Sequence, residues 1–288
     1  MGGRIAEGFG VVPRPVDHKV FPDGESYIKI DPDLKGETVV IVQTTAPSQD
    51  QRLMQLFMMV RTAKELDAAR VVCVVPYLAY SRQDKRFLEG EAYTLDLVLK
   101  MMSDLGVDDL IVADVHSKAS LDKINSEYMI EIHNLSGTPL LAEYLKGNGF
   151  DGAYSLSPDK GAIHLAQAAD VVLSGGYGYF EKARDLRTGE IEMKVKDLDV
   201  SGRKAVVFDD IISSGGTMAL AIEGLKNQGA KSVAAACTHA LFMGDAGDRI
   251  REAGSDVVVF TDSVETSTEG VKLTIAPLVV RELNRLAS

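Results

Sequence analysis

Two aspartates followed by a loop of small residues form the strongest chemical signal in the sequence. Asp209 and Asp210 come directly after the apolar run 205–208, and the loop behind them opens a helix-like segment, 217–228. The loop and the helix start contribute Ser213, Ser214, Gly215, Gly216 and Thr217. Such a loop offers backbone N–H groups and hydroxyls to a phosphate, and carboxylates in front of it can bind the hydroxyls of a sugar. We therefore expect a sugar-phosphate site; the alternative is an ordinary strand–turn–helix with Ser213 as N-cap.

A group of cationic and amide donors follows another apolar run and Pro76. Its members are Arg82, Gln83, Lys85 and Arg86. The carboxyl ends of strands in open α/β sheets bind ligands, so donors gathered there favour a polyphosphate. A solvated basic turn is the alternative interpretation.

A glycine-rich segment, residues 175–185, carries the cationic pair Lys182 and Arg184. Flexible glycines beside two cations are typical of a loop that closes over a reacting phosphate. An exposed basic β-hairpin is the alternative.

Two further segments carry weaker signals. His116 lies beside Asp114 at the end of the apolar run 110–113, and a single histidine in such a place is more often structural than a metal ligand. Asp23 and Glu25 occupy a Pro-Asp-Gly-Glu turn before a possible strand, 26–30; by themselves they indicate a tight turn with solvated charges.

Composition limits the classes of function. The 288-residue chain has 45% hydrophobic residues and a net charge of -11, which disfavours binding to nucleic acid or anionic lipid but permits small phosphorylated ligands. No apolar run reaches the roughly 20 residues that span a bilayer, and the start lacks a signal-peptide pattern. The two cysteines, Cys73 and Cys237, lie in apolar runs and are expected to be buried free thiols. We expect a cytoplasmic protein without a membrane or nucleic-acid partner.

The elements that must position these residues alternate along the chain. Strands are expected at 38–43, 71–75, 110–114, 153–156, 205–208, 233–237 and 257–261. Most are rich in Val, Ile and Ala without alternation, as in strands covered on both faces. Helix-like segments at 49–66, 94–105 and 217–228 separate them, which predicts an α/β fold with parallel strands.

Glycines near residues 146–151 suggest a boundary between two domains, 1–147 and 148–275. The last segment, 276–288, has Leu278, Val279, Leu283 and Leu286 on one side of a helix, so it must dock on another surface. We expect it to pack on the first domain. The start of the chain offers a helix-like segment, 4–8, with no strand before it.

Several of these segments together resemble one enzyme family. Residues 209–217 resemble the phosphoribosyl-diphosphate motif of type I phosphoribosyltransferases and of ribose-phosphate pyrophosphokinases. The segments 21–25, 77–86, 114–117, 157–161, 238–242 and 261–264 resemble the pyrophosphokinase signatures in the same order. The resemblance extends over about residues 20–285, and Ser213 at the first loop position makes the chain look closest to the archaeal type.

The resemblance implies two tandem type I phosphoribosyltransferase-like domains and a specific reaction. The diphosphoryl group of MgATP would pass to the 1-hydroxyl of ribose 5-phosphate, giving phosphoribosyl diphosphate and AMP. Lys182 and Arg184 would be catalytic, and His116 and Asp159 would hold Mg²⁺ as the cofactor.

The resemblance also implies the binding residues for both substrates. ATP would contact Arg82 and Gln83 of one subunit and Phe21, Asp23, Gly24 and Glu25 of a neighbour. Ribose 5-phosphate would contact Arg184, Asp209, Asp210, Ser213, Ser214, Gly215, Gly216 and Thr217. A homodimer or hexamer that shares its ATP sites is therefore expected. A non-catalytic regulatory paralogue and a phosphoribosyltransferase are the alternatives.

Overall fold

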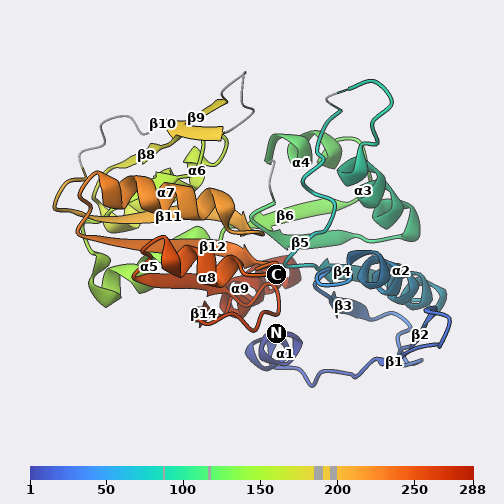
Figure 1. Ribbon diagram of the computed structural model, residues 1–288. Coiled ribbons are helices and arrows are strands. Elements are labelled where there is room, and N and C mark those ends of the chain that lie inside the picture. Colours follow the sequence, from blue (N-terminus) through green and yellow to red (C-terminus); the bar gives the residue numbers. More distant parts are fainter. Residues whose placement is uncertain (87, 116–117, 185–190, 195–199) are drawn as a thin grey trace. The chain divides into compact units, whose positions relative to one another are not determined.

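The chain divides into two compact units in the computed structural model, which describes residues 1–86, 88–115, 118–184, 191–194 and 200–288 (Figure 1). Unit 1 comprises Met1–Leu135 and Ala276–Ser288, and unit 2 comprises Ser136–Ile275. None of the described helices is long and apolar enough to cross a membrane.

Unit 1 contains a parallel sheet with the strand order β3-β4-β5-β6. Its strands are β3 (Thr38–Val42), β4 (Arg70–Val74), β5 (Asp109–Ala113) and β6 (Glu131–Leu135). An antiparallel hairpin consists of β1 (Asp17–Val20) and β2 (Ser26–Lys29). The helices are α1 (Gly2–Phe9), α2 (Gln49–Glu65), α3 (Thr94–Leu105), α4 (Lys118–Asn125) and α9 (Ala276–Ala287).

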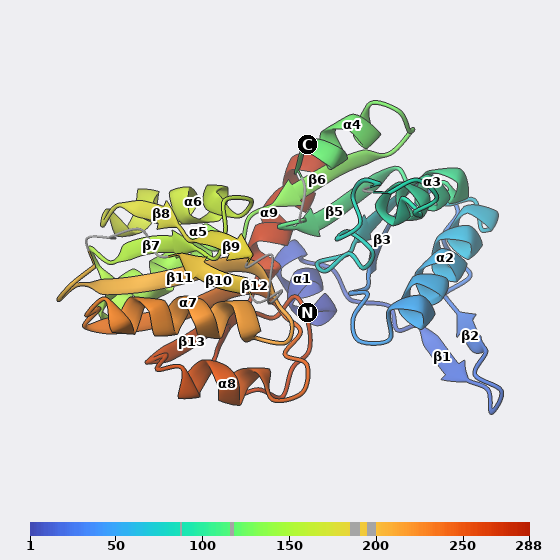
Figure 2. The ribbon, with the colours of Figure 1, turned by 45° about the horizontal axis from the view of Figure 1, so that its top comes forward.

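The two ends of the chain pack together on the sheet of unit 1. Ile5 of α1 and Val279 and Leu283 of α9 share one buried cluster with Val72 and Ile111 of the sheet. Both helices are amphipathic, so each buries one apolar stripe and leaves the other face in water. Figure 2 shows α9 beside α1 in this unit.

Unit 2 is built on a larger parallel sheet with the order β14-β13-β12-β11-β7-β8. Its strands are β7 (Tyr154–Ser157), β8 (Tyr177–Tyr179), β11 (Lys204–Ile212), β12 (Ser232–Ala240), β13 (Val257–Thr261) and β14 (Val271–Leu273). β9 (Glu181–Arg184) and β10 (Ile191–Lys194) pair as an antiparallel hairpin. The helices are α5 (Thr138–Leu145), α6 (Ile163–Leu173), α7 (Gly216–Asn227) and α8 (Ala246–Glu252), with the short η1 (Lys146–Phe150).

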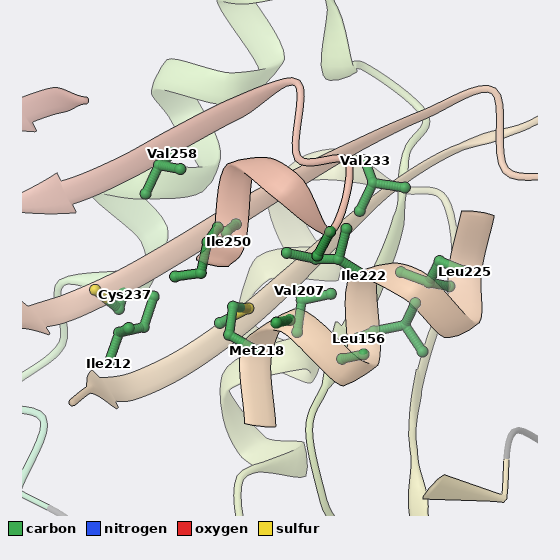
Figure 3. Packing of buried hydrophobic residues seen from close by; sticks show 14 of the residues in the cluster. Leu156, Val207, Ile212, Met218, Ile222, Leu225, Val233, Cys237, Ile250 and Val258 are labelled. Carbon is green, nitrogen blue, oxygen red and sulfur yellow. The ribbon is translucent and has the colours of Figure 1, made fainter. Parts of the chain in front are cut away.

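Helices cover both faces of the central strands of unit 2, which explains their unbroken apolar sequences. On one face, α7 and α8 contribute Met218, Ile222 and Ile250 to a cluster with Val207 and Val233 of the sheet (Figure 3). On the other face, α5 and α6 pack on alternate residues of the same strands. Both cysteines are buried and free, as expected.

The expected domain boundary near residues 146–151 lies too late, because unit 2 begins at Ser136. Helix α5 belongs to unit 2: Leu141 and Leu145 are buried in its core together with residues of α6 and β12. The glycines that suggested a linker, Gly147 and Gly149, form the turn that leaves this helix. The last helix belongs to unit 1.

The strands that carry the aspartate pair are longer than the apolar pattern indicates. β11 continues through Asp209 and Asp210 to Ile212, because backbone pairing with β12 continues past the apolar residues. Asp209 is opposite Cys237, and Ile211 is opposite His239. The carboxylates therefore lie on a paired strand, and the loop begins only at Ser213.

Candidate functional site

Three carboxylates meet at the carboxyl edge of the sheet in unit 2. β7 and β11 are parallel neighbours, so Asp159, just after β7, comes close to Asp209 and Asp210 near the end of β11. The pKa of Asp209 is raised well above its usual range, first by burial and then by the negative charges of Asp210 and Asp159. A group of this kind favours a cation or a hydrogen-bond donor as its ligand.

Backbone hydrogen bonds hold these carboxylates in place. The N–H groups of Gly161 and Ala162 donate to Asp159 Oδ1 at 2.9 and 3.3 Å, and the Ser157 hydroxyl donates to the Asp159 carbonyl at 2.8 Å. The Asp210 N–H donates to Asp209 Oδ1 at 3.0 Å, and the Ile211 N–H donates to Asp210 Oδ1 at 2.8 Å. Backbone groups therefore fix the direction of these carboxylates, and carboxylate oxygens are ligands that Mg²⁺ accepts.

The loop after β11 presents the N-terminus of α7. The helix begins at Gly216, and its N-cap is Gly215 with φ 76°, without a side-chain cap. Ser213 as N-cap, the ordinary alternative for this segment, is therefore wrong. Since the first N–H groups of a helix have no acceptor within it, they are available to an anion, which the helix dipole also favours.

Close packing explains why the loop contains Gly215. A Cβ at this position would lie 2.9 Å from the Ala246 carbonyl oxygen at the start of α8, and the left-handed φ independently favours glycine. The segment after β12 fixes the other side of the loop, because the Met243 N–H donates to the Ser213 carbonyl at 2.9 Å. His239 lies near the end of β12, with Nδ1 2.9 Å from the Ser263 hydroxyl.

In unit 1, Arg82 and Gln83 lie in the loop between β4 and α3. Arg82 is exposed, whereas Gln83 is half-buried and accepts a hydrogen bond from Leu95 N–H at 3.3 Å through its carbonyl. This loop follows the carboxyl end of a parallel strand, the edge at which open α/β sheets bind ligands. Arg82 is thus accessible to a charged ligand, and its contact with ATP stays a prediction.

The hairpin of β1 and β2 presents the other predicted ATP residues at its tip. Phe21, Asp23, Gly24 and Glu25 are all exposed, and Gly24 has φ 96°. Phe21 N–H donates to the Glu25 carbonyl at 2.8 Å and Glu25 N–H donates to Asp23 Oδ1 at 3.2 Å, which fixes the turn. The Phe21 ring lies edge-on to Tyr27 at 6.4 Å, with the Lys19 ammonium 4.7 Å from its centroid. An aromatic ring with acidic neighbours therefore projects into solvent.

The structure describes the backbone of the two predicted catalytic residues but does not describe the predicted metal ligand His116. The backbone of Lys182 and Arg184 lies in β9, where they pair with Met193 and Ile191 of β10. The backbone of this segment thus forms a hairpin, and the catalytic role of the two side chains stays a prediction. His116 lies outside the described residues, so its role as a metal ligand stays a prediction.

The structure thus brings together one part of the predicted set. Asp159, Asp209, Asp210 and the loop from Ser213 to Gly216 share one edge of unit 2, whereas Arg82, Gln83 and the hairpin tip belong to unit 1. Sequence reasoning paired Asp159 with His116 and missed its place beside Asp209. The available signal was that both aspartates come after apolar runs, 153–156 and 205–208, and the carboxyl ends of parallel strands lie at one edge of a sheet.

A second acidic group in unit 1 consists of Asp109, Glu131 and His133, whose ligand atoms lie within 4.8 Å of one another. Arg70 already binds Asp109 with two hydrogen bonds of 2.7 and 2.8 Å. His133 also faces Glu282 of α9, with 3.1 Å between Nδ1 and Oε1. We interpret the group as an ion-pair network that holds α9, because arginine supplies the positive charge that a metal would bring.

Comparison with known proteins agrees with these features. Residues 1–106 match the N-terminal domain of ribose phosphate pyrophosphokinase, and residues 156–275 match the phosphoribosyl transferase domain. The chain is 38% identical over 259 residues to a ribose-phosphate pyrophosphokinase of Sulfolobus acidocaldarius, covering 90% of this chain and 87% of the relative. A ribose-phosphate pyrophosphokinase of Methanopyrus kandleri is 36% identical over 289 residues, covering 100% and 96%.

A solved structure shares the whole fold. Phosphoribosylpyrophosphate synthetase from Mycobacterium smegmatis has a TM-score of 0.88 at 25% identity, covering 99% of this chain and 94% of its own. The tandem α/β architecture, the carboxylates before a phosphate-type loop and the similarity to archaeal relatives all agree. The chain belongs to the ribose-phosphate pyrophosphokinase family.

Proposed function

We propose that this chain transfers the diphosphoryl group of ATP to the 1-hydroxyl of ribose 5-phosphate. The ribose oxygen attacks the β-phosphorus, the bond from that phosphorus to the α,β-bridging oxygen breaks, and AMP leaves while the hydroxyl proton is released. The observation that carries the proposal is the convergence of Asp159, Asp209 and Asp210 with an anion-accepting helix start at one sheet edge. Membership of the family supports the same reaction.

In this proposal, unit 2 binds ribose 5-phosphate. The N–H groups at the start of α7 and the hydroxyls of Ser213, Ser214 and Thr217 hold the 5-phosphate, while Gly215 and Gly216 let it approach the backbone. Asp209 and Asp210 accept hydrogen bonds from the ribose hydroxyls. A neutral hydroxyl donor suits Asp209, whose environment disfavours an uncompensated negative charge.

Mg²⁺ fits the donors at this edge. Asp159 supplies a carboxylate fixed by backbone N–H groups, and His116 is its expected partner. The ion supplies positive charge to the phosphate oxygens during transfer. Burial, together with the negative charges of Asp210 and Asp159, raises the pKa of Asp209, which supports a cation at this edge.

Unit 1 is the proposed ATP side. Arg82 and Gln83 contact the nucleotide, and the exposed tip with Phe21, Asp23, Gly24 and Glu25 serves the ATP site of a neighbouring copy. Such an exposed tip has a use in an oligomer, so a dimer or hexamer is expected. Lys182 and Arg184 are the cations that stabilise the transferring group.

The test is formation of AMP from ATP and ribose 5-phosphate with Mg²⁺. We expect AMP and phosphoribosyl diphosphate in equal amounts, and a Lys182→Ala variant with a far lower kcat as the matched control. Pyrophosphate release from phosphoribosyl diphosphate and a nucleobase, without AMP formation, would instead identify a phosphoribosyltransferase. Absence of both activities would indicate a regulatory paralogue.

A further inference from the structure

The proposed 5-phosphate loop has no cation of its own. Residues 209–217 include two aspartates and no lysine or arginine. A phosphate monoester carries about 1.5 to 2 negative charges at neutral pH, whereas a helix N-terminus offers only about half a positive charge. With Asp159, Asp209 and Asp210 close by, the balance of charge at this edge calls for a cation from another element.

Helix α8 brings an arginine to the loop. Its first residue, Ala246, is buried and packs against Gly215, so the position of the helix relative to the loop is fixed by close contact. Arg249 Nη1 lies 3.8 Å from the point that a Cβ would occupy at Gly216, and the Ser214 hydroxyl lies 3.9 Å from the same point. A guanidinium and a hydroxyl thus converge on the first residue of α7.

The other side of the Arg249 guanidinium is held by an ion pair. Nη2 donates to Asp245 Oδ1 at 2.8 Å, one turn earlier. The Arg249 side chain is 44% exposed, so a ligand from solvent can reach it. A guanidinium fixed by one carboxylate keeps further N–H donors in a rigid fork, which suits the oxygens of a phosphate.

We propose that Arg249 binds the 5-phosphate of ribose 5-phosphate at the N-terminus of α7, with Asp245 as its positioning residue. This inference rests on the proposed function, because it assigns a residue to the same sugar-phosphate site. The arginine supplies the guanidinium donors that residues 209–217 lack, and the close packing of α8 on Gly215 fixes its backbone beside the loop. We expect the contact to be equally strong in the ground state and the transition state, because the 5-phosphate does not change during transfer; such uniform binding lowers KM and leaves kcat unchanged.

Arg251 provides a matched control on the same helix. It pairs with Asp248 as Arg249 pairs with Asp245, and the two arginine side chains are 43% and 44% exposed. Arg251 Nη1 lies 3.7 Å from the Cβ point of Gly247, within α8, where no anion-accepting loop is placed. A surface ion pair without further function would make the two arginines equivalent.

The experiment measures steady-state kinetics of AMP formation for Arg249→Gln, Arg249→Lys and Arg251→Gln, with thermal unfolding of each variant. For Arg249→Gln we expect KM for ribose 5-phosphate to rise about tenfold or more, since a hydrogen bond to a charged group is lost, while kcat and KM for ATP change less than about twofold. Arg249→Lys should recover part of this loss, and Arg251→Gln should match the unmodified protein.

Equal kinetics for Arg249→Gln and Arg251→Gln would overturn the proposal, as would a loss of kcat together with a lower melting temperature. If the unmodified protein forms no AMP, the proposed function fails, and calorimetric titration with ribose 5-phosphate decides the role of Arg249 separately. Weaker binding to Arg249→Gln than to Arg251→Gln would still support it. Equal binding, or no binding to the unmodified protein, would overturn it.

Discussion

At the scale of single residues, the environment of Asp209 suits a bound ligand but destabilises the ligand-free fold. Burial and the charges of Asp210 and Asp159 raise its pKa in the folded protein. For a carboxyl group with a raised folded pKa, the favourable contribution to folding is present at low pH and is lost as pH rises through that pKa. Well above the pKa of an unfolded aspartate, the ligand-free protein therefore loses stability by keeping this carboxyl group at the site.

We predict that Asp209→Asn raises the melting temperature of the ligand-free protein at neutral pH and abolishes most of its activity. The amide keeps the shape of this half-buried side chain and cannot ionise. The gain should shrink as pH falls, because protonation then neutralises the carboxyl of the parent protein as well. Calorimetry over a range of pH measures this, and a variant less stable than the parent at neutral pH would contradict the argument.

Gly215 is constrained by conformation and by packing, and the two effects can be separated. Gly215→Ala adds a Cβ at a left-handed φ of 76° and places it 2.9 Å from the Ala246 carbonyl oxygen. Gly202→Ala is the control, because its φ is 73° and a Cβ there meets nothing within 4 Å. Both changes should cost about 1–2 kcal/mol of stability, because each places a Cβ in the left-handed region.

We predict that Gly215→Ala alone also raises KM for ribose 5-phosphate, because α8 and the loop must move apart. Kinetics and denaturant unfolding of the two variants provide the measurement. Equal effects of the two changes on both quantities would show that conformation alone explains the glycine.

At the scale of elements, the last helix is held by a network of charges and not by apolar packing alone. Glu282 of α9 accepts hydrogen bonds from Arg285 at 2.7 and 3.0 Å and faces His133 of β6. The hydrogen bond that Arg285 donates lowers the pKa of Glu282 below its usual range. Partial burial acts in the opposite direction. Arg70 adds a hydrogen bond from Nη1 to the Leu286 carbonyl at 3.0 Å.

We predict that Glu282→Gln destabilises unit 1 at neutral pH and has little effect under acid conditions. A carboxyl with a lowered folded pKa stabilises the fold above its unfolded pKa, about 4.3 for glutamate, and this contribution is lost as pH falls through the folded pKa. Chemical unfolding of parent and variant at neutral pH and near pH 3 checks the sign. A difference in unfolding free energy between parent and variant that grows as pH falls would contradict this prediction.

The elements also show what the sequence could and could not predict. Apolar runs located the strands, and β13 (Val257–Thr261) and α3 (Thr94–Leu105) match the expected bounds. The extension of β11 through Asp209 was not predictable from local polarity, because pairing with β12 decides it. The unit boundary was missed for a similar reason: α5 belongs to unit 2 through its tertiary contacts, whereas Gly147 gave a strong local turn signal.

At the scale of the whole molecule, the two units join a helix to the sheet in the same way, through a lysine and a backbone N–H that donate to one aspartate oxygen. In unit 1, Lys64 at the end of α2 donates to Asp108 Oδ2 at 2.7 Å, and the same oxygen accepts Val71 N–H at 2.7 Å. In unit 2, the corresponding bonds join Lys226 and Val233 N–H to Asp256 Oδ2 at 3.0 and 2.7 Å. The sequence shows no residue-level repeat, so this likeness became visible only from the contacts.

The likeness extends to the backbone around each lysine. Asp67 and Gly229, three positions after the two lysines, both have positive φ, 60° and 81°. A glycine lies two positions before each aspartate, and the lysine stem lies against it: Lys64 carbon atoms are 3.0–3.4 Å from the Cβ point of Gly106, and those of Lys226 are 3.3–3.7 Å from that of Gly254. The two halves of the enzyme are thus similar in fine detail as well as in fold.

Because each of these lysine–aspartate contacts lies within one unit, its removal should destabilise that unit alone. Asp256 is partly buried, yet hydrogen bonds from Val233 N–H, Lys226 and Ser232 lower its pKa. We predict that Asp256→Ala speeds amide hydrogen exchange in β12 and β13 and leaves β4 and β5 unchanged, with the reverse for Asp108→Ala. Each change removes at least two hydrogen bonds and should cost about 1–3 kcal/mol. The hydrogen bonds of Asp108 and those of Asp256 share no residue, so the stability losses of the two changes should add in the double variant. Faster exchange in both units after either single change would contradict the prediction, because it would mean that the two units unfold together.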